Sequence, residues 1–485
     1  MVTFTFGNAD DLTIAVSSNG DTYLIGNGAN DVVNVQNAQF DVIQLGNGFH
    51  DVVAAVGSRF DVISLGNGDH DFVSADSGVT DSITLGNGIG DVVNANQSNN
   101  TTITLGGGAG DAVNANFANF GTITLGNGNN DVVDAQVALF EVVQLGTGNN
   151  DAVDVSHGRG DSVTLGNGFG DTVDASIAGD STITLGSGNG DAVKADGANN
   201  TTITLGDGAG DVVNANGSIS TTITLGNGAG DAVNASNIFT GSISTTQDVI
   251  TLGDGNNDRV EAVDSHNQTI TLGNGIGDVV NALIHLNSFG SASDNKITLG
   301  DGNDDQVSID NGSGIGPARD IITLGNGIGD LVGAESSTST TITLGNGAGD
   351  RVDATGTEND IITVGNGIND FVGASGSTGD IISVGNGNDT IYVGTANAVT
   401  VGTGQDSFVF DQTQPSTIGA VTINGFDPSK DVIVLQQALQ NTNPYSVHDD
   451  ASGNAVITFQ NDAQDSITLV GVHSAALHTS DFHLV

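Results

Sequence analysis

The sequence contains no cysteine, no tryptophan and only 4 prolines, and its 485 residues include 8 basic side chains against 57 acidic ones. The absence of cysteine excludes disulfide-stapled scaffolds, thiolate metal sites and cysteine nucleophiles. A formal net charge of −49 excludes the basic surface that nucleic-acid binders need, and an anionic membrane surface would repel the chain. No run of about 18 apolar residues is present, so the sequence predicts no membrane insertion.

Two further features limit the class of protein. Hydrophobic residues make up 37% of the chain but aromatic residues only 4%, which predicts a narrow core of small aliphatic side chains. The segment from Met1 to Gly7 lacks the basic and apolar regions of an N-terminal signal peptide. If the protein leaves the cell, we therefore expect a route that does not read the N-terminus.

An internal repeat organises most of the sequence. An aspartate that follows a Gly-x-Gly-x-x unit recurs every 20 residues from Asp31 to Asp231, and the series then continues with some longer spacings. The extra residues fall around 237–247, 285–294 and 311–317, and they are rich in Ser, Gly and Asn, so we expect loops that bulge from one side of the coils. Repeats of this length are typical of solenoids.

Each repeat contains two short segments that alternate between apolar and polar residues, for example 91–95 and 101–105. Such alternation places Val, Ile, Leu and Ala on one face of a strand and Asn, Ser and Thr on the other. We therefore predict an all-β protein, a parallel β-solenoid or β-roll of roughly 19 coils with two short strands per coil, over residues 1–410. Residues 411–485 are predicted to form a small β-rich C-terminal cap. We expect the turns to contain glycine because it adopts positive φ without strain, with Asn the next most tolerant residue.

In-register stacking of the coils would bring the aspartates of the Gly-x-Gly turn into a ladder. Two carboxylates about 5 Å apart repel each other by about 1 kcal/mol in water and by several times that at a lower dielectric. The chain offers few basic partners, so hard divalent cations with oxygen ligands are one way to neutralise the ladder. The alternative is that each Asp caps the turn by accepting hydrogen bonds from nearby backbone N–H groups.

A comparison between the two turns of the coil separates these interpretations. In the second turn, aspartates such as Asp41 and Asp61 exchange with Thr101 and Ser181, which suits a capping role. The Gly-x-Gly turn does not make that exchange, so we predict calcium there and capping at the second turn. The predicted Ca2+ ligands are Asp31, Asp51, Asp71, Asp91, Asp111, Asp131, Asp151, Asp171, Asp191, Asp211, Asp231, Asp258, Asp278, Asp305, Asp330, Asp350, Asp370, Asp389 and Asp406.

Two segments near the end of the array resemble a known calcium-binding repeat. Residues 385–391 (Gly-Asn-Gly-Asn-Asp-Thr-Ile) and 402–408 (Gly-Thr-Gly-Gln-Asp-Ser-Phe) are similar to the Gly-Gly-x-Gly-x-Asp-x-apolar-x nonapeptides of the RTX (repeats-in-toxin) family. The main repeats carry one residue more, Gly-x-Gly-x-x-Asp, so the family's coordination geometry does not transfer to them unaltered. Residues 423–435, which contain Gly-Phe-Asp and a following Asp, resemble the C-terminal region of RTX proteins exported by type I secretion.

The resemblance implies a route and a place of action. A chain of this family would stay unfolded in the low calcium of the cytosol, pass through the type I secretion machinery, and fold when it binds extracellular calcium. The resemblance therefore implies an extracellular or cell-surface location, with an uncleaved secretion signal in residues 411–485. A terminal cap without a signalling role is the alternative for that segment.

The sequence predicts that the protein is not an enzyme, because no hydrolase, metalloprotease or phosphate-loop motif is present and the repeats occupy nearly the whole chain. Histidines such as His50 and His157 share no spacing with a nucleophile. We predict a secreted structural protein that self-assembles into a surface layer, filament or matrix fibre, since the apolar strand from Val2 to Phe6 would present an open edge. A monomer, in which this strand pairs only with the first coil, is the alternative.

Two other functions are considered. Rows of outward threonines, which include Thr104, Thr124 and Thr204, make ice binding the alternative function, although Val42 and Val62 interrupt the second row. A carbohydrate adhesin would need exposed aromatic platforms, and 3 tyrosines with no tryptophan offer few.

Overall fold

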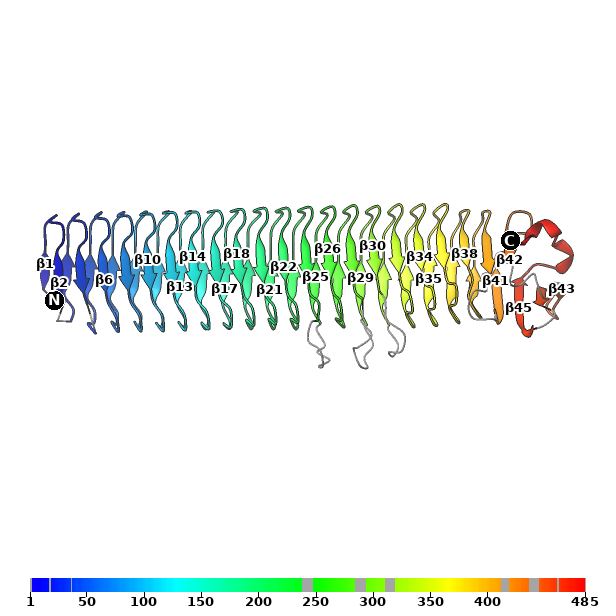
Figure 1. Cartoon of the computed structure of the whole chain (residues 1–485), viewed down its shortest axis with the longest axis horizontal. Coiled ribbons are helices and arrows are strands. Elements are labelled where there is room, and N and C mark those ends of the chain that lie inside the picture. Colours follow the sequence, from blue (N-terminus) through cyan, green and yellow to red (C-terminus); the bar gives the residue numbers. More distant parts are fainter. Residues whose placement is uncertain are drawn as a thin grey trace. The chain divides into compact units, whose positions relative to one another are not determined.

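The computed structural model of the chain forms two compact units, Met1–Asn234 and Ala235–Val485, which are described separately (Figure 1). The predicted insertions lie almost entirely outside the described residues. The structure describes residues 2–16, 19–35, 37–237, 247–283, 294–309, 319–410, 418–435, 445–459 and 462–484.

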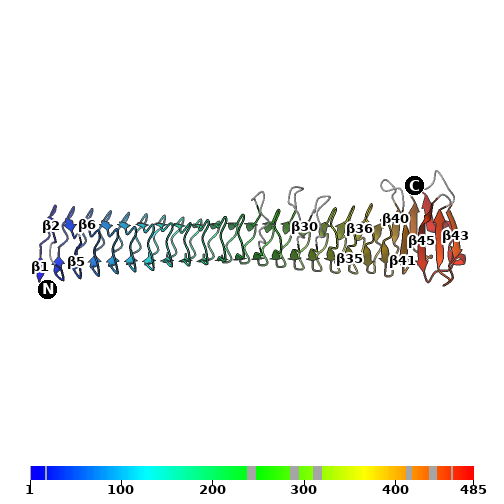
Figure 2. The same cartoon turned by 90° about the horizontal axis from the view of Figure 1, so that it is seen from below.

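Unit 1 is a stack of coils, and each coil contributes one short strand to each of two parallel sheets, which Figure 2 shows as two facing layers. The first sheet contains β1 (Thr3–Thr5), β3 (Thr22–Leu24), β5 (Val42–Gln44), β7 (Val62–Ser64), β9 (Ser82–Thr84), β11 (Thr102–Thr104), β13 (Thr122–Thr124), β15 (Val142–Gln144), β17 (Ser162–Thr164), β19 (Thr182–Thr184), β21 (Thr202–Thr204) and β23 (Thr222–Thr224). The second sheet contains β2 (Thr13–Ala15), β4 (Val32–Asn34), β6 (Val52–Ala54), β8 (Phe72–Ser74), β10 (Val92–Asn94), β12 (Ala112–Asn114), β14 (Val132–Asp134), β16 (Ala152–Asp154), β18 (Thr172–Asp174), β20 (Ala192–Lys194), β22 (Val212–Asn214) and β24 (Ala232–Asn234).

Unit 2 repeats this arrangement and ends in additional strands. Its first sheet contains β25 (Val249–Thr251), β27 (Thr269–Thr271), β29 (Lys296–Thr298), β31 (Ile321–Thr323), β33 (Thr341–Thr343), β35 (Ile361–Val364), β37 (Ile381–Val384), β39 (Ala398–Thr400), β41 (Ala420–Asn424), β43 (Tyr445–Asp449), β44 (Ala455–Phe459) and β45 (Asp462–Val470). Its second sheet contains β26 (Arg259–Glu261), β28 (Val279–Asn281), β30 (Gln306–Ser308), β32 (Leu331–Gly333), β34 (Arg351–Asp353), β36 (Phe371–Gly373), β38 (Thr390–Tyr392), β40 (Ser407–Phe410), β42 (Val432–Leu435) and β46 (Phe482–Leu484).

The strands pair in register from coil to coil. In unit 1, Val93 of β10 pairs with Val113 of β12, and Ile103 of β11 pairs with Ile123 of β13, in both cases in parallel. In unit 1 the middle residue of each strand from β2 to β24 is buried and its two neighbours face outward, so successive coils stack similar, mostly aliphatic side chains along the interior. The prediction of an all-β parallel solenoid with two strands per coil is confirmed.

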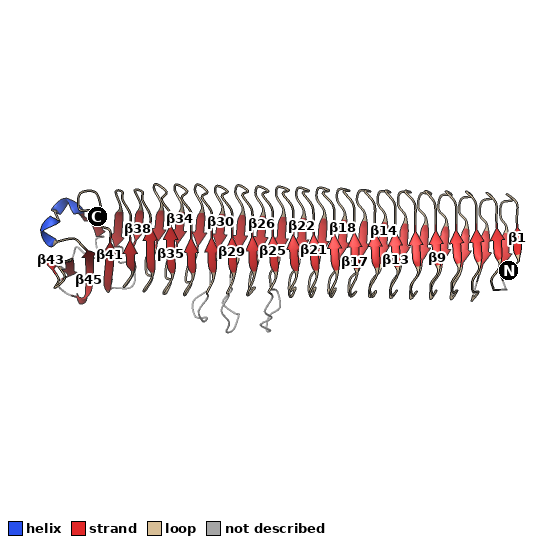
Figure 3. Cartoon of the chain, turned by 180° about the vertical axis from the view of Figure 1, so that it is seen from behind, coloured by secondary structure: helices blue, strands red, loops and turns tan. Residues whose placement is uncertain are grey.

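The end of unit 2 departs from the coil pattern. The two sheets continue past residue 410, because β41 pairs with β39 and β42 pairs with β40. The strands β43 and β44 then form an antiparallel pair, and β45 lies between β44 and β41. Short 3-10 helices, η1 (Ser474–Ala476) and η2 (Thr479–Asp481), are the helical elements of the described chain (Figure 3). No helix among the described residues is long and apolar enough to cross a membrane.

The role expected for the paired glycines of the Gly-x-Gly turn is wrong. Positive φ values occur instead at the residue just before the turn aspartate, such as Asn30 (φ 59) and Gly110 (φ 75). A Cβ added at Gly108 would overlap the carbonyl oxygen of Gly88 in the preceding coil, so this glycine is required by the close stacking of the turns. Asn between the glycines is not in the left-handed region either; its side chain serves the stack, since Asn67 Oδ1 accepts from the backbone N–H of Asn87 at 2.9 Å.

Two glycines of one turn should therefore respond differently to the same substitution. We expect Gly108→Ala to destabilise unit 1 by about 3 kcal/mol, because the added methyl group forces adjacent turns apart. Gly110→Ala should cost only about 1 kcal/mol, since a Cβ at Gly110 meets no atom within 4 Å and only the positive φ is unfavourable. Denaturant unfolding of the two variants measures the difference, and equal losses would contradict the stacking argument.

Candidate functional site

The aspartates predicted as calcium ligands all lie inside the two units. Each follows the Gly-x-Gly turn, which we call the first turn, and enters the second sheet with its side chain pointing inward. None of these side chains is more than 1% exposed. They share the inward face with the aliphatic core, as Asp111, Val113 and Ala115 do in one coil.

One oxygen of each carboxylate caps the backbone of the preceding coil. The N–H of Asp91 donates to Oδ1 of Asp111 at 3.0 Å, and the N–H of Asp111 donates to Oδ1 of Asp131 at 3.0 Å. The pattern runs from Asp31 to Asp231 in unit 1 and from Asp258 onward in unit 2. It ends at Asp431, whose Oδ1 accepts from the N–H of Asp406 at 2.9 Å. We call the two series the first-turn ladders.

The sequence prediction missed Asp431 as a ladder member. It lies 25 residues after Asp406 and does not follow a Gly-x-Gly unit, so the repeat motif does not mark it. The available signal was the Gly-Phe-Asp segment, because the N–H of Asp427 donates to Oδ2 of Asp431 at 2.7 Å.

In most ladder aspartates the other carboxylate oxygen is buried and has no hydrogen-bond partner. This holds for Oδ2 of the ladder aspartates from Asp31 to Asp211 and from Asp278 to Asp406 within the described chain. Oδ2 of Asp111 lies against the turn itself, 3.1 Å from the position that a Cβ on Gly108 would take. A buried charge without partners is costly, so each ladder residue favours either a proton or a nearby cation.

Burial shifts the protonation of these groups. Desolvation raises the pKa of Asp71 and that of Asp111 to about 7, and that of Asp51 to about 6, while the backbone N–H caps act in the opposite direction. The neighbouring carboxylates of the ladder raise the pKa of Asp111 further. Burial therefore favours protonation of these carboxyls in mildly acidic solution.

The second turn uses the same capping geometry. The N–H of Asp41 donates to Oδ1 of Asp61 at 2.9 Å, and the N–H of Asp161 donates to the hydroxyl of Ser181 at 3.2 Å. The prediction of capping at the second turn is confirmed, and a hydroxyl can replace the carboxylate there. Some second-turn residues also use their other oxygen, since Ser58 Oγ donates to Oδ2 of Asp81 at 3.0 Å.

The capping geometry bears on the calcium prediction without testing it. Each coil supplies one buried ladder carboxylate at the first turn, and its Oδ1 is engaged by a backbone N–H, whereas Ca2+ takes about six to eight oxygen ligands. Within the described ranges, no three His, Cys, Asp or Glu side chains converge in a way that could hold a metal ion. The unpartnered Oδ2 atoms are the ligands that the ladders could offer. Calcium binding at these aspartates therefore stays a prediction.

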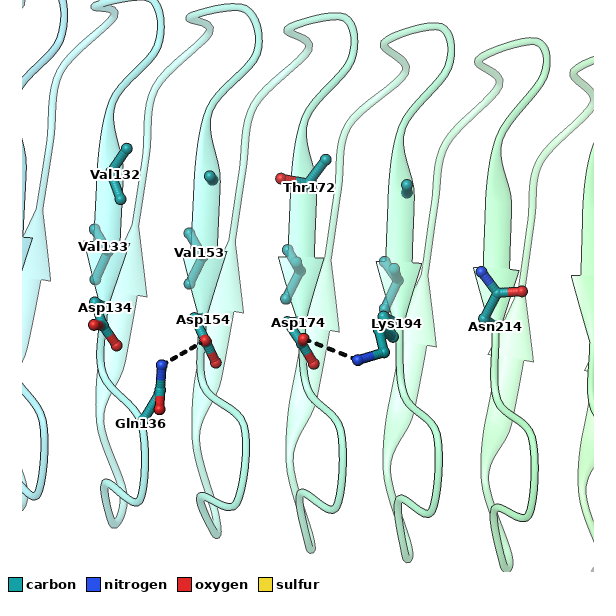
Figure 4. Close-up of a pocket in the computed structure, with 14 residues that line it drawn as sticks. Val132, Val133, Asp134, Gln136, Val153, Asp154, Thr172, Asp174, Lys194 and Asn214 are labelled. Carbon is teal, nitrogen blue, oxygen red and sulfur yellow. Dashed lines mark hydrogen bonds and ion pairs between the residues drawn. The ribbon is translucent and has the colours of Figure 1, made fainter.

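A shallow groove of about 480 Å³ lies on the outer face of the second sheet of unit 1 (Figure 4). The small side chains of Ala152 and Ala192 leave this space, and the outward carboxylates of Asp154 and Asp174 lie along one side of it. Gln136 Nε2 donates to Asp154 Oδ2 at 2.8 Å, and Lys194 Nζ lies 3.3 Å from Asp174 Oδ2. These carboxylates have partners within the sheet, so the groove does not define a cation site.

Comparison with known proteins adds little to this description. The sequence matches no family model and no curated protein. Among solved structures, the chain is similar to HetL, a pentapeptide repeat protein involved in heterocyst differentiation regulation from the cyanobacterium Nostoc sp. strain PCC 7120. The identity is 10%, the match covers 46% of this chain and 84% of that chain, and the TM-score is 0.14, so this similarity carries no argument about function. The chain is a β-solenoid repeat protein on its own structure.

The buried second-turn carboxylates predict a stability that falls with rising pH. Burial raises the pKa of Glu141 to about 7, so the folded state binds more protons than the unfolded state and loses stability as the pH rises through this value. Without divalent cations, we expect a higher unfolding temperature at pH 5 than at pH 8. Glu141→Gln should shrink the difference in unfolding free energy between these pH values by on the order of 3 kcal/mol.

Asp180→Asn is the control for the Glu141 variant. Asp180 is exposed, and hydrogen bonds from Asn200 and Arg159 lower its pKa, so its removal should not reduce the loss of stability at high pH. Unfolding curves at pH 5 and pH 8 measure both variants. The same pH dependence in the wild type and the Glu141 variant would contradict the assigned role of the buried carboxyl.

Proposed function

We propose that this chain is a structural protein that is secreted, folds outside the cell with calcium, and self-associates into a surface layer or fibre. The observation that carries the proposal is the filled interior of the coils. Ile103, Leu105, Val113 and Ala115 are at most 2% exposed, and Asp111 completes the same coil with a backbone cap. Such an interior leaves the protein's outer surface as its means of acting.

The repeat supports self-association because it presents the same outward positions many times. In-register stacking places corresponding outward side chains in rows, about 4.8 Å apart from coil to coil. A weak contact made by one coil is then repeated along the row, and repeated contacts raise the overall affinity without any single strong one. Structural fibres and layers depend on this kind of repeated contact.

Calcium enters the proposal as a means of neutralising the first-turn ladders at neutral pH. The support is the row of buried, unpartnered Oδ2 atoms, which are hard oxygen ligands of the kind that Ca2+ prefers. If binding is coupled to folding, the chain stays unfolded where calcium is scarce and folds where it is abundant. This behaviour would suit export in an unfolded state, in keeping with the RTX-like segment at 423–435.

The proposal predicts a calcium effect that depends on pH. At pH 7.5 we expect circular dichroism to show a folded β protein with millimolar calcium and a much less stable one with chelator. At pH 5 the difference should largely vanish, because protons then neutralise the ladders. Negative-stain microscopy of the calcium sample should show extended assemblies. Equal stability in calcium and in chelator at pH 7.5 would contradict calcium-coupled folding. Isolated single particles would contradict self-association.

Ice binding is the second candidate, because the structure arranges threonines in a two-dimensional array. On β19, β21 and β23, Thr182 pairs with Thr202 and Thr202 with Thr222, while a parallel row runs through Thr184, Thr204 and Thr224. Val42, Val62 and Val142 interrupt the first of these rows elsewhere in unit 1. We expect thermal hysteresis if this face orders water, and Thr204→Lys should abolish most of it. No hysteresis at high protein concentration would remove this candidate.

A further inference from the structure

Four phenylalanines form an exposed row along the second turns of unit 1, which lie at the lower edge of that unit in Figure 1. Phe40 and Phe60 are 57% and 46% exposed, and their rings stack at a centroid distance of 4.9 Å. Phe120 and Phe140 are 57% and 49% exposed and stack at 5.2 Å. We call these four residues the aromatic ridge. It consists of two stacked pairs separated by two coils.

The ridge residues occupy a position where phenylalanine is unfavourable. Their φ values lie between 56 and 62, in the left-handed region that costs a bulky L-residue about 1 kcal/mol or more. The coils between and after the pairs place Thr80, Asn100, Gly160 and Asp180 at the same position, and most of these residue types tolerate that conformation better. The fold therefore does not require phenylalanine here, and the backbone conformation is one that a bulky residue adopts at a cost.

Among the described second turns, exposed aromatic side chains at this position occur in unit 1. Beside the ridge, Phe117, Val137, Leu139 and Ile177 are also exposed, each by 40% or more. The corresponding left-handed positions of unit 2 carry polar or small residues, which include Asn267, Ser339, Asn359 and Gly379. Exposed apolar patches of this extent mark interaction surfaces in soluble proteins.

The order of residues along the ridge is complementary to the same order read in the opposite direction. From Phe40 to Asp180, the eight left-handed positions read Phe, Phe, Thr, Asn, Phe, Phe, Gly, Asp, one per coil. In the reverse direction, each Phe falls opposite a smaller or polar residue. Because coils stack about 4.8 Å apart, each pair and each gap is about 10 Å wide, so the pairs of one copy match the gaps of another.

We propose that a second copy of this chain docks on the aromatic ridge in the antiparallel direction, about a two-fold axis. Phe120 of each copy then faces Asn100 of the other, and Phe140 faces Thr80. Nearer the ends, Phe60 faces Gly160 and Phe40 faces Asp180. Such a contact is isologous, since every pair of facing residues occurs twice. It rests on the proposed self-association and names the surface that makes the lateral contact.

The available area suits a stable dimer. A phenylalanine side chain buries about 150–250 Å², so roughly half of that remains to be buried at each ridge residue. The four ridge residues and their four apolar neighbours together offer roughly 700 Å² per copy, close to the ~800 Å² per partner of a standard interface.

The ridge carries charges of both signs. Arg59 lies on the turn of Phe60, and Arg159 lies on the turn of Gly160, one coil after the second aromatic pair. Asp180 is the one carboxylate among the gap residues, and Arg159 Nη2 lies 2.7 Å from its Oδ2. In the antiparallel register the turn of Arg59 faces the turn of Arg159, whose positive charge is offset by Asp180.

Sedimentation velocity of the full chain over a range of concentrations tests the proposal. The ridge variant Phe40→Asn, Phe60→Asn, Phe120→Asn, Phe140→Asn uses the residue that other coils carry at this position, so we expect it to fold. Its dimer dissociation constant should rise at least about 100-fold. The control variant Phe49→Asn, Ile89→Asn, Phe169→Asn removes equally exposed side chains from the first turn and should leave dimerisation unchanged.

A gap-filled variant, Thr80→Phe with Asn100→Phe, separates matched docking from general stickiness. It adds apolar surface but fills a gap, so matched docking predicts weaker dimerisation and non-specific association predicts stronger. A monomeric wild type, an unchanged ridge variant, or a gap-filled variant that dimerises more tightly would each overturn the proposal. If extended assemblies persist in the ridge variant, the proposed ridge contact is wrong, but the proposed self-association stands. A ridge-dependent dimer without extended assemblies would instead count against the proposed function.

Discussion

The hydrogen bond from a turn N–H to the side-chain oxygen of the next coil is the interaction on which the stack depends. The strand ladders end where each coil turns, and an N–H buried there without a partner costs about 1–3 kcal/mol. Asp131 Oδ1 provides that partner for Asp111. The bond links structurally equivalent positions whatever the number of residues between them: Asp305 caps Asp278 over 27 residues, and Asp330 caps Asp305 over 25. Insertions are therefore tolerated at the second turn as long as the first turn keeps its register.

Periodicity predicted the coil, its two strands and its aliphatic interior, because alternation with a period of two is set by strand geometry alone. The same alternation predicts that the ladder aspartates face inward. Asp111, Val113 and Ala115 share one phase, so the aspartate had to face inward with the core. The sequence could not predict that Oδ1 caps a backbone N–H while Oδ2 has no partner. It also could not predict that close stacking of the turns requires glycine at position 108. Both features depend on distances between coils. Phe40 has a φ of 62, in the left-handed region that phenylalanine disfavours. Local preference therefore does not predict this conformation, which depends on the folded turn.

The capping bond explains why each first turn carries a side-chain oxygen, but it does not by itself require that oxygen to be charged. A carboxylate oxygen is a strong acceptor for a backbone N–H, and its short side chain reaches the preceding coil without strain. The hydroxyl of Ser181 does the same work at the second turn, so charge is not needed for capping itself. The cost is the second oxygen, which at Asp111 lies buried against the glycine of its own turn. A proton or a cation relieves that cost, and which of the two does so depends on the surroundings of the protein.

The same constraint determines where the chain is free to vary. Inward positions must repeat, since each stacks on its equivalent one coil away, and the left-handed turn positions must accept positive φ. Outward positions on the strands meet neither demand, and the exposed left-handed turn positions meet only the second, so at both places the side chains vary between coils. The threonine array occupies the first sheet, the carboxylates with Lys194 lie on the second, and the aromatic ridge lies on the second turns of unit 1. Phe40, Phe60, Phe120 and Phe140 go further, because they keep bulky side chains where smaller ones would stabilise the turn. A contact with a second copy, as proposed above, would give these exposed rings a role that the isolated chain does not.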